Sequence, residues 1–296
     1  MLSHEEMIGL QAEKHDLIDD RQFPSQEAFV LHLMHSAAYD YIKPLVTGKA
    51  VLDLGCNTGY GSHTLSGSAS RIVGVDVSSG AISTAKERYP EQEFLQTDGQ
   101  KLPFEENSFD TTVSCQVIEH IVDYQRYISE IKRVLKPTGV VHFTTPNSRL
   151  RLDPGMKPWN EFHVREFDFE TLEELLRKYF KHVAVFGLFA TEPLYSIEVA
   201  REKRGLEDAR LEASRSYAYK LGRVGIRKLV PKAIRQAFSG KPNPPAPLDD
   251  EFRQKHSTAD FFYQTTEREK AIDLMAVCSD DSEALERVSR SLTVAR

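Results

Sequence analysis

Three carboxylates stand at or near the ends of three successive apolar stretches in the first third of the chain. Asp53 lies in "AVLDLG", Asp76 ends "RIVGVD" and Asp98 follows "EFLQT". If these stretches are strands of one parallel sheet, their carboxyl ends share an edge and the three side chains line one crevice. A carboxylate suits a cationic ammonium or sulfonium group at Asp53, two ribose hydroxyls at Asp76 and an adenine amine at Asp98. The spacing indicates a crevice for a cationic adenosine ligand.

A glycine-rich turn follows the first of these stretches in "VLDLGCNTGYGSHTL", residues 51–65. Gly55 and Gly59 predict a tight strand-to-helix turn of the kind that holds nucleotide-like ligands. A dinucleotide-binding turn would place a pyrophosphate at the helix N-terminus, and the Asp53 carboxylate would repel it. The turn therefore argues against a nicotinamide-dependent oxidoreductase.

Short apolar runs alternate with amphipathic segments between residues 50 and 145. Strands that alternate with helices of this size predict βαβ units and a parallel sheet. Two further apolar runs, 182–190 and 271–279, are too apolar for loops, and we expect them to pair as neighbours. Residues 191–266 then form an insertion of helices followed by a proline-rich linker.

The overall composition is that of a globular protein, with 296 residues, 40% of them hydrophobic and 28% charged. A net charge of −6 argues against a chain built to cover a nucleic-acid backbone. The acidic N-terminus does not resemble a signal peptide, and no run approaches 18 apolar residues, so we expect a cytoplasmic protein. The three scattered cysteines fit neither a disulfide framework nor a zinc cluster.

The motifs "VLDLGCNTGYG", "IVGVDVS", "TDGQKLPFEENSFDTTVSCQVIEHI" and "EIKRVLKPTGVVHFTTPN" resemble those of class I S-adenosylmethionine-dependent methyltransferases. The resemblance implies a Rossmann-like α/β fold with a seven-stranded mixed sheet of order 3-2-1-4-5-7-6, helices on both faces and a helical insertion between the last two strands. It divides the chain into five parts: an N-terminal helical cap (1–45), a methyltransferase core (46–190), a basic helical insertion with its linker (191–266), the last core strand (267–280) and a C-terminal tail (281–296).

The resemblance also assigns S-adenosylmethionine binding to particular residues. They are Asp53, Gly55 and Gly59 for the methionine portion, Asp76 and Val77 for the ribose and adenine, Asp98 and Gly99 for the adenine edge, and Gln116 for the floor beside the methyl donor. The family's second motif glycine is Asn57 here. Asn tolerates a left-handed backbone better than most residues, so we expect the turn to be kept.

Methyl transfer from a sulfonium is an in-line displacement, so the protein must align the reactants and help to remove a proton from a hydroxyl acceptor. His120 and Glu119 follow the fourth strand in "QVIEHI". We expect His120 to be the base, because an imidazole titrates near neutral pH, with Glu119 beside it. Alternatively, Glu119 only caps or braces the following helix, and His120 is a hydrogen-bonded framework residue.

The loop after the fifth strand, "TTPNSRLRLDPGMKPWNEFHVREF", is rich in polar and aromatic side chains. Such a mixture suits a hydroxylated substrate, because each buried hydroxyl needs a partner. We expect substrate contacts from Asn147, Trp159, His163 and Arg165; alternatively, the last two only pin the loop. The stretch "NEFHVREF" also resembles methyltransferases of bacterial glycan pathways. This favours O-methylation of a sugar or other polyhydroxylated metabolite, including a lipid-linked one, without a metal.

Two other functions stay open. The same segments partly resemble the small-RNA 3′-terminal 2′-O-methyltransferases, in which case Glu119, His120 and His163 would hold a metal ion. Gln116 stands where that family has another ligating Glu. The other alternative is a catalytically idle binding protein. It is disfavoured because a scaffold needs no carboxylates around a crevice.

Residues 214–241 carry eight basic side chains and no acidic one, interleaved with apolar residues. This pattern is typical of an interfacial helix, and we expect peripheral contact with an anionic membrane or with phosphates. A solvated face or a homodimer contact is the alternative.

Overall fold

The computed structural model describes residues 23–97, 101–222 and 245–293, with side chains except those of 215–222 and 293. Two predicted cofactor residues, Asp98 and Gly99, lie outside the described residues, as do the basic side chains of 214–241. The expected membrane, phosphate or homodimer contacts of that segment therefore stay predictions.

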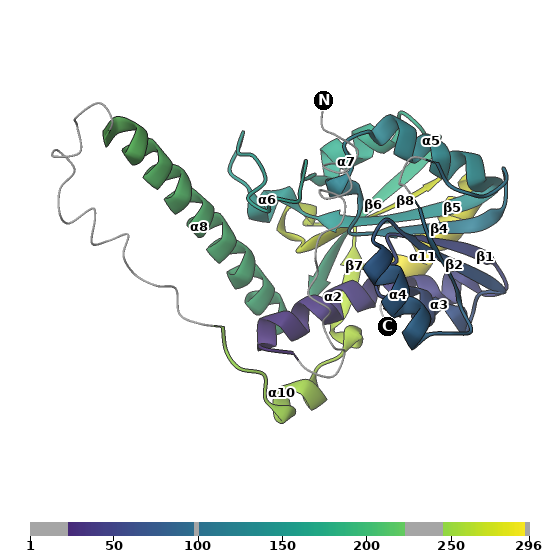
Figure 1. Cartoon of the computed structure of the whole chain (residues 1–296), viewed down its shortest axis with the longest axis horizontal. Coiled ribbons are helices and arrows are strands. Elements are labelled where there is room, and N and C mark those ends of the chain that lie inside the picture. The colour runs from purple at the N-terminus through teal and green to yellow at the C-terminus, as the bar shows by residue number, and fades with distance from the viewer. Residues whose placement is uncertain (1–22, 98–100, 223–244, 294–296) are drawn as a thin grey trace.

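One mixed sheet of eight strands forms the centre of the molecule (Figure 1). The strands are β1 (Ala50–Leu54), β2 (Arg71–Asp76), β3 (Glu93–Gln96), β4 (Phe109–Cys115), β5 (Leu135–Pro146), β6 (His182–Ala190), β7 (Phe261–Gln264) and β8 (Asp273–Ser279). Their order is β3-β2-β1-β4-β5-β8-β6-β7. The first five strands pair in parallel, whereas β8, β6 and β7 pair antiparallel. The predicted Rossmann-like α/β fold is confirmed.

The sheet has one strand more than predicted. The seven expected strands follow the expected order, but β7 adds an edge beyond β6 and lies inside the segment that we expected to hold only helices and a linker. Its four residues, "FFYQ", alternate between more buried and more exposed side chains. A segment this short carries too little pattern to predict a strand. Pairing with β6, where Leu188 lies opposite Tyr263, decides their conformation.

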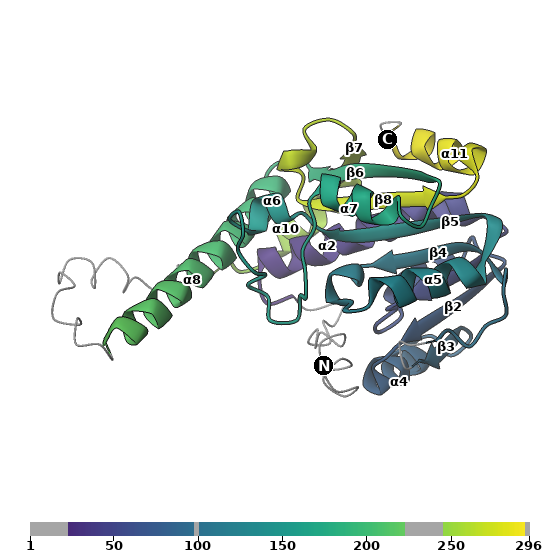
Figure 2. The same ribbon diagram turned by 90° about the horizontal axis from the view of Figure 1, so that it is seen from above.

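Helices cover both faces of the sheet, as Figure 2 shows. They are α2 (Gln26–Ile42), α3 (Tyr60–Ser66), α4 (Ser79–Arg88), α5 (Tyr124–Val134), α6 (Ser148–Arg151), α7 (Phe169–Leu176), α8 (Leu194–Gly222), α10 (Asp250–Lys255) and α11 (Ser282–Thr293). Alternate strand residues point to opposite faces. Val51 therefore packs in the core beneath α2, α3 and α11, and Leu52 packs in the core beneath α5 and α7.

Helix α2 begins at a cap in which the Ser25 side chain accepts a hydrogen bond from the Ala28 amide. Near its other end, Tyr39 is buried against α3, directly beneath Gly61. A Cβ at position 61 would lie 2.1 Å from the Tyr39 ring. The two helices can approach this closely only because residue 61 has no side chain.

Helix α8 extends away from the sheet for 29 residues (Figures 1 and 2). A buried ion pair anchors its first half: Arg151 of α6 contacts Glu202 at 2.6 Å, and within α8 Arg201 contacts the buried Glu198 at 2.5 Å. Within the part of the chain that the structure describes, no helix combines the length and the apolar character that crossing a membrane requires.

Replacing Gly61 by Ala is expected to lower the free energy of unfolding by about 1–3 kcal/mol, because the new methyl group overpacks the Tyr39 ring. The matched control is Gly67→Ala at the end of the same helix, where a Cβ meets no atom within 4 Å. Guanidinium unfolding of both variants checks this. Equal midpoints for the two would contradict the proposed close packing.

Candidate functional site

The glycine-rich turn after β1 has a left-handed backbone at three positions. The φ angles are 72° at Gly55, 48° at Asn57 and 84° at Gly59. The expectation that Asn57 would keep the turn is confirmed. The amides of Gly55 and Cys56 both donate to the Val75 carbonyl of β2, at 2.8 and 3.0 Å. The turn is thereby tied to the end of the neighbouring strand.

Asp76 ends β2 and is oriented by two backbone amides. The amide of Asn57 donates to Oδ2 at 2.9 Å, and the amide of Ser78 donates to Oδ1 at 2.8 Å. The side chain is half-buried. A carboxylate has about four acceptor positions, so these two bonds are compatible with further hydroxyl donors. Val77 follows directly, and its carbonyl accepts a hydrogen bond from Gln96 Nε2 at 3.1 Å.

Asp53 lies fully buried beneath the turn. Ser62 Oγ donates to Oδ2 at 2.6 Å and Tyr39 Oη donates to Oδ1 at 3.2 Å. Burial raises the pKa of Asp53 to about 6; the two hydrogen bonds oppose that increase and the nearby Asp76 adds to it. A cation nearby would favour the ionised form of this carboxyl.

Gln116 follows β4 and also has a left-handed backbone, with φ 56°. Its Nε2 donates to Thr144 Oγ1 at 3.1 Å and to Asp273 Oδ2 at 2.8 Å. The bonds hold the side-chain amide at the junction of β4, β5 and β8.

Asp273 is a buried carboxyl at this edge that the sequence analysis missed. Burial raises its pKa well above the ordinary value, the Gln116 hydrogen bond opposes the increase, and Glu119 adds to it. Its Oδ1 has no hydrogen-bond partner among the described residues. The signal was a single charged residue in the apolar run "AIDLMAVCS".

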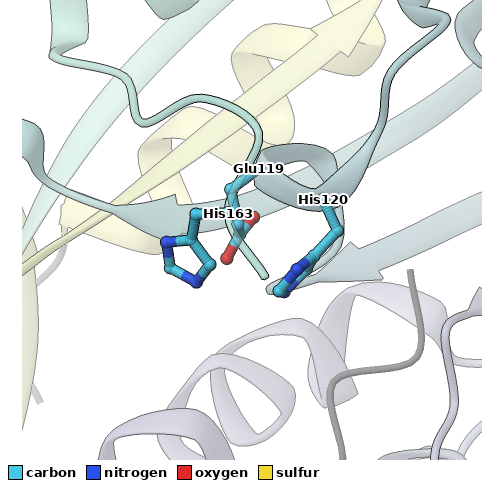
Figure 3. A group of neighbouring side chains, drawn as sticks. All are labelled: Glu119, His120 and His163. Carbon is cyan, nitrogen blue, oxygen red and sulfur yellow. The ribbon is translucent and has the colours of Figure 1, made fainter. Parts of the chain in front are cut away.

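Glu119, His120 and His163 form a buried cluster (Figure 3). The first two lie in the 3-10 helix Ile118–His120, and His163 comes from the loop between α6 and α7. One ligand-type atom of each side chain lies within 4.8 Å of the other two. Glu119 is 1% exposed and His120 3%, and the side chain of His163 is 5% exposed. The structure thus joins residues that the sequence places 43 positions apart.

Backbone hydrogen bonds bring the loop of His163 to Glu119. The amides of Val164 and Arg165 donate to the Glu119 carbonyl at 2.9 and 3.2 Å. Thr145 Oγ1 donates to Glu119 Oε2 at 3.0 Å. Burial raises the pKa of Glu119, and the two histidines partly oppose the increase.

The remaining predicted substrate residues serve different purposes. Asn147 is fully buried, and its Nδ2 donates to the carbonyls of Arg268 and Ala271. This side chain therefore braces the start of the loop and is not presented to a substrate. Arg165 is exposed, with its guanidinium 5.5 Å from the centre of the Tyr124 ring.

Trp159 packs the middle of the loop against α6 and α8. Its Nε1 donates to the Arg151 carbonyl at 3.1 Å, and its ring lies 4.3 Å from the Arg151 guanidinium. A Cβ on Gly205 of α8 would lie 2.6 Å from the same ring. These contacts account for Trp159 as a packing residue.

Comparisons with known proteins agree with this arrangement. Residues 52–143 match a methyltransferase domain model. A Mycobacterium tuberculosis protein named a probable S-adenosylmethionine-dependent methyltransferase is 35% identical over 179 residues, which are 60% of this chain and 65% of that protein. A ubiquinone biosynthesis O-methyltransferase of Coxiella burnetii is 31% identical over 46% of this chain and 61% of its own length. This chain therefore spans just under two thirds of these relatives.

The fold is also similar to that of a solved methyltransferase from Thermotoga maritima. The two share 15% identity with a TM-score of 0.51, over 86% of this chain and 92% of that one. The motifs, the strand order and the sequence match together show that residues 52–143 carry a methyltransferase domain, within a fold similar to that of S-adenosylmethionine-dependent methyltransferases.

Proposed function

We propose that this protein transfers the methyl group of S-adenosylmethionine to a hydroxyl of a sugar or another polyhydroxylated acceptor. The proposal is carried by one observation: two sets of side chains lie at the same edge of the sheet. Asp53 and Asp76 flank the glycine-rich turn, and the buried cluster of Glu119, His120 and His163 follows the adjacent strand β4.

The donor set around the turn fits the cosubstrate chemically. The Asp76 carboxylate, already aligned by two amides, suits the two hydroxyls of a ribose. Asp53 suits a positive charge, since a cation offsets the cost of ionising a buried carboxyl. Gln116 would form the floor beside the reacting group. When bound, the sulfonium supplies an activated methyl group that an aligned nucleophile displaces in line.

The cluster after β4 supports oxygen as the atom that receives the methyl group. An acceptor hydroxyl must lose its proton as the new carbon–oxygen bond forms and the carbon–sulfur bond breaks. We assign this proton loss to His120, whose ring is oriented by the hydrogen bond to the Phe162 carbonyl. The Coxiella burnetii relative, by its name, also methylates an oxygen atom.

Methyl-labelled S-adenosylmethionine, added with the protein to a lysate of the source cells, should label the polysaccharide or organic-soluble fraction. Asp76→Ala should reduce this label at least about tenfold, because a charge-assisted contact to the cosubstrate is lost. The fractions are counted with and without ribonuclease. Ribonuclease-sensitive label would instead support the RNA alternative, and label that persists in Asp76→Ala would contradict the assigned crevice.

The affinity for S-adenosylmethionine should depend on the protonation of Asp53. Its pKa of about 6 means that the free protein is protonated there at pH 5 and ionised at pH 7. A cationic ligand favours the ionised carboxyl, so its affinity should fall up to about tenfold per pH unit below 6. Calorimetry at pH 5, 6 and 7 measures this. Asp53→Asn should flatten the profile; an unchanged slope in that variant would refute the assignment.

A further inference from the structure

Both histidines of the buried cluster are held through Nδ1. His120 Nδ1 lies 2.9 Å from the Phe162 carbonyl, which can only accept, so this nitrogen carries the proton. His163 Nδ1 lies 2.7 Å from Glu166 Oε1. Glu166 also accepts a hydrogen bond from the Arg151 guanidinium, so its carboxylate is the acceptor toward His163. An imidazole that donates through Nδ1 in this way offers its lone pair, when it has one, at Nε2.

A second layer of buried charges fixes His163. Arg151 Nε donates to Glu166 Oε2 at 2.9 Å, and its Nη1 donates to Glu202 of α8 at 2.6 Å. The side chains of Arg151, Glu166 and Glu202 are at most 4% exposed. Removing one partner of such a buried pair is costly, which makes the network rigid. Helix α8 thus helps to hold the His163 ring in place.

The three side chains of the cluster lie close together, with one ligand-type atom of each within 4.8 Å of the other two. Glu119 is oriented by Thr145, and each imidazole is oriented by the partner of its Nδ1. The rings of His120 and His163 are nearly perpendicular, at 85°, with centroids 4.8 Å apart. Figure 3 shows the carboxylate of Glu119 between the two rings. Lone pairs gathered in this way repel one another unless a positive charge lies among them.

We propose that Glu119, His120 and His163 bind a divalent first-row transition-metal cation. Two imidazoles and one carboxylate form a facial set that suits such cations and leaves other coordination positions open. Hydrogen bonds from metal-binding histidines to a carbonyl and a carboxylate are the usual outer layer of these sites. Around zinc the ligand atoms lie about 3.3 Å apart. The side chains would therefore close in slightly from the present 4.8 Å limit.

The role of this cation rests on the proposed function. Glu119, His120 and His163 would hold the cation, which would supply Lewis acidity to an acceptor hydroxyl whose proton would leave to water. The oxygen lone pair then forms the bond to the methyl carbon while the carbon–sulfur bond breaks, and S-adenosylhomocysteine is released. His120 assists proton loss as a ligand in this arrangement. The open positions favour an acceptor with two neighbouring hydroxyls.

Metal titration of the full chain tests the site. Protein treated with a chelator is titrated with Co²⁺, followed by visible absorption, and with Zn²⁺, followed by calorimetry. We expect saturable binding of about one equivalent in the wild type. His163→Ala and the isosteric Glu119→Gln should each weaken binding at least about tenfold. The control is His182→Ala at the start of β6, which pairs with Ser279 away from the cluster and should bind as the wild type does.

The outcomes separate this inference from the proposed function, because S-adenosylhomocysteine binding is measured on the same samples. Absence of saturable metal binding in the wild type, or equal affinities in His163→Ala and His182→Ala, would overturn the metal site even where S-adenosylhomocysteine binds. Metal binding without S-adenosylhomocysteine binding would support the site and contradict the proposed function. Glu119→Gln keeps the Thr145 hydrogen bond possible, so its loss of metal with unchanged thermal unfolding supports direct ligation.

Discussion

Parallel pairing of β1 with β2 and β4 is the constraint on which the site depends. It places the carboxyl ends of neighbouring strands at one edge, with Asp53 opposite Gly74 on one side and Val113 on the other. Most of the groups assigned to the proposed reaction follow from that edge, whereas His163 comes from the loop between α6 and α7. The glycine-rich turn leaves β1, Asp76 ends β2, and Gln116 and Glu119 follow β4. Helices on both faces exclude water from the strands, whereas the carboxyl ends of the strands stay available for ligands.

Buried charge supplies the second level of organisation. The chain of contacts from Glu202 through Arg151 and Glu166 to His163 links the insertion helix α8 to the cluster after β4. Burying these ions costs desolvation energy, and the mutual pairing offsets it only where the geometry is good. The insertion is thus coupled mechanically to the loop that carries His163. Helix α2, which packs against α8, is in turn linked to the Asp53 carboxyl by Tyr39.

The sequence predicted what local patterns determine. Strand-and-helix alternation gave the parallel sheet, and the positions of Asp53, Asp76 and the turn glycines gave the edge at which they meet. Tertiary contacts determined the rest: β7 is a strand because β6 offers an edge, and Asn147 and Trp159 brace the loop because their partners lie in distant segments. Asp273 could have been found as the one charge in an apolar run, but its contact with Gln116 spans 157 residues.

The affinity of S-adenosylhomocysteine for three proteins decides whether the edge formed by β1, β2 and β4 binds the cosubstrate. Wild type, Asp76→Asn and Asp110→Asn are compared by calorimetry, because Asp110 lies at the start of β4, where it accepts from the Ala50 amide and Lys136. We expect binding by the wild type and by Asp110→Asn, and an affinity at least about tenfold lower for Asp76→Asn. Equal affinities for all three proteins, or no binding by the wild type, would contradict it.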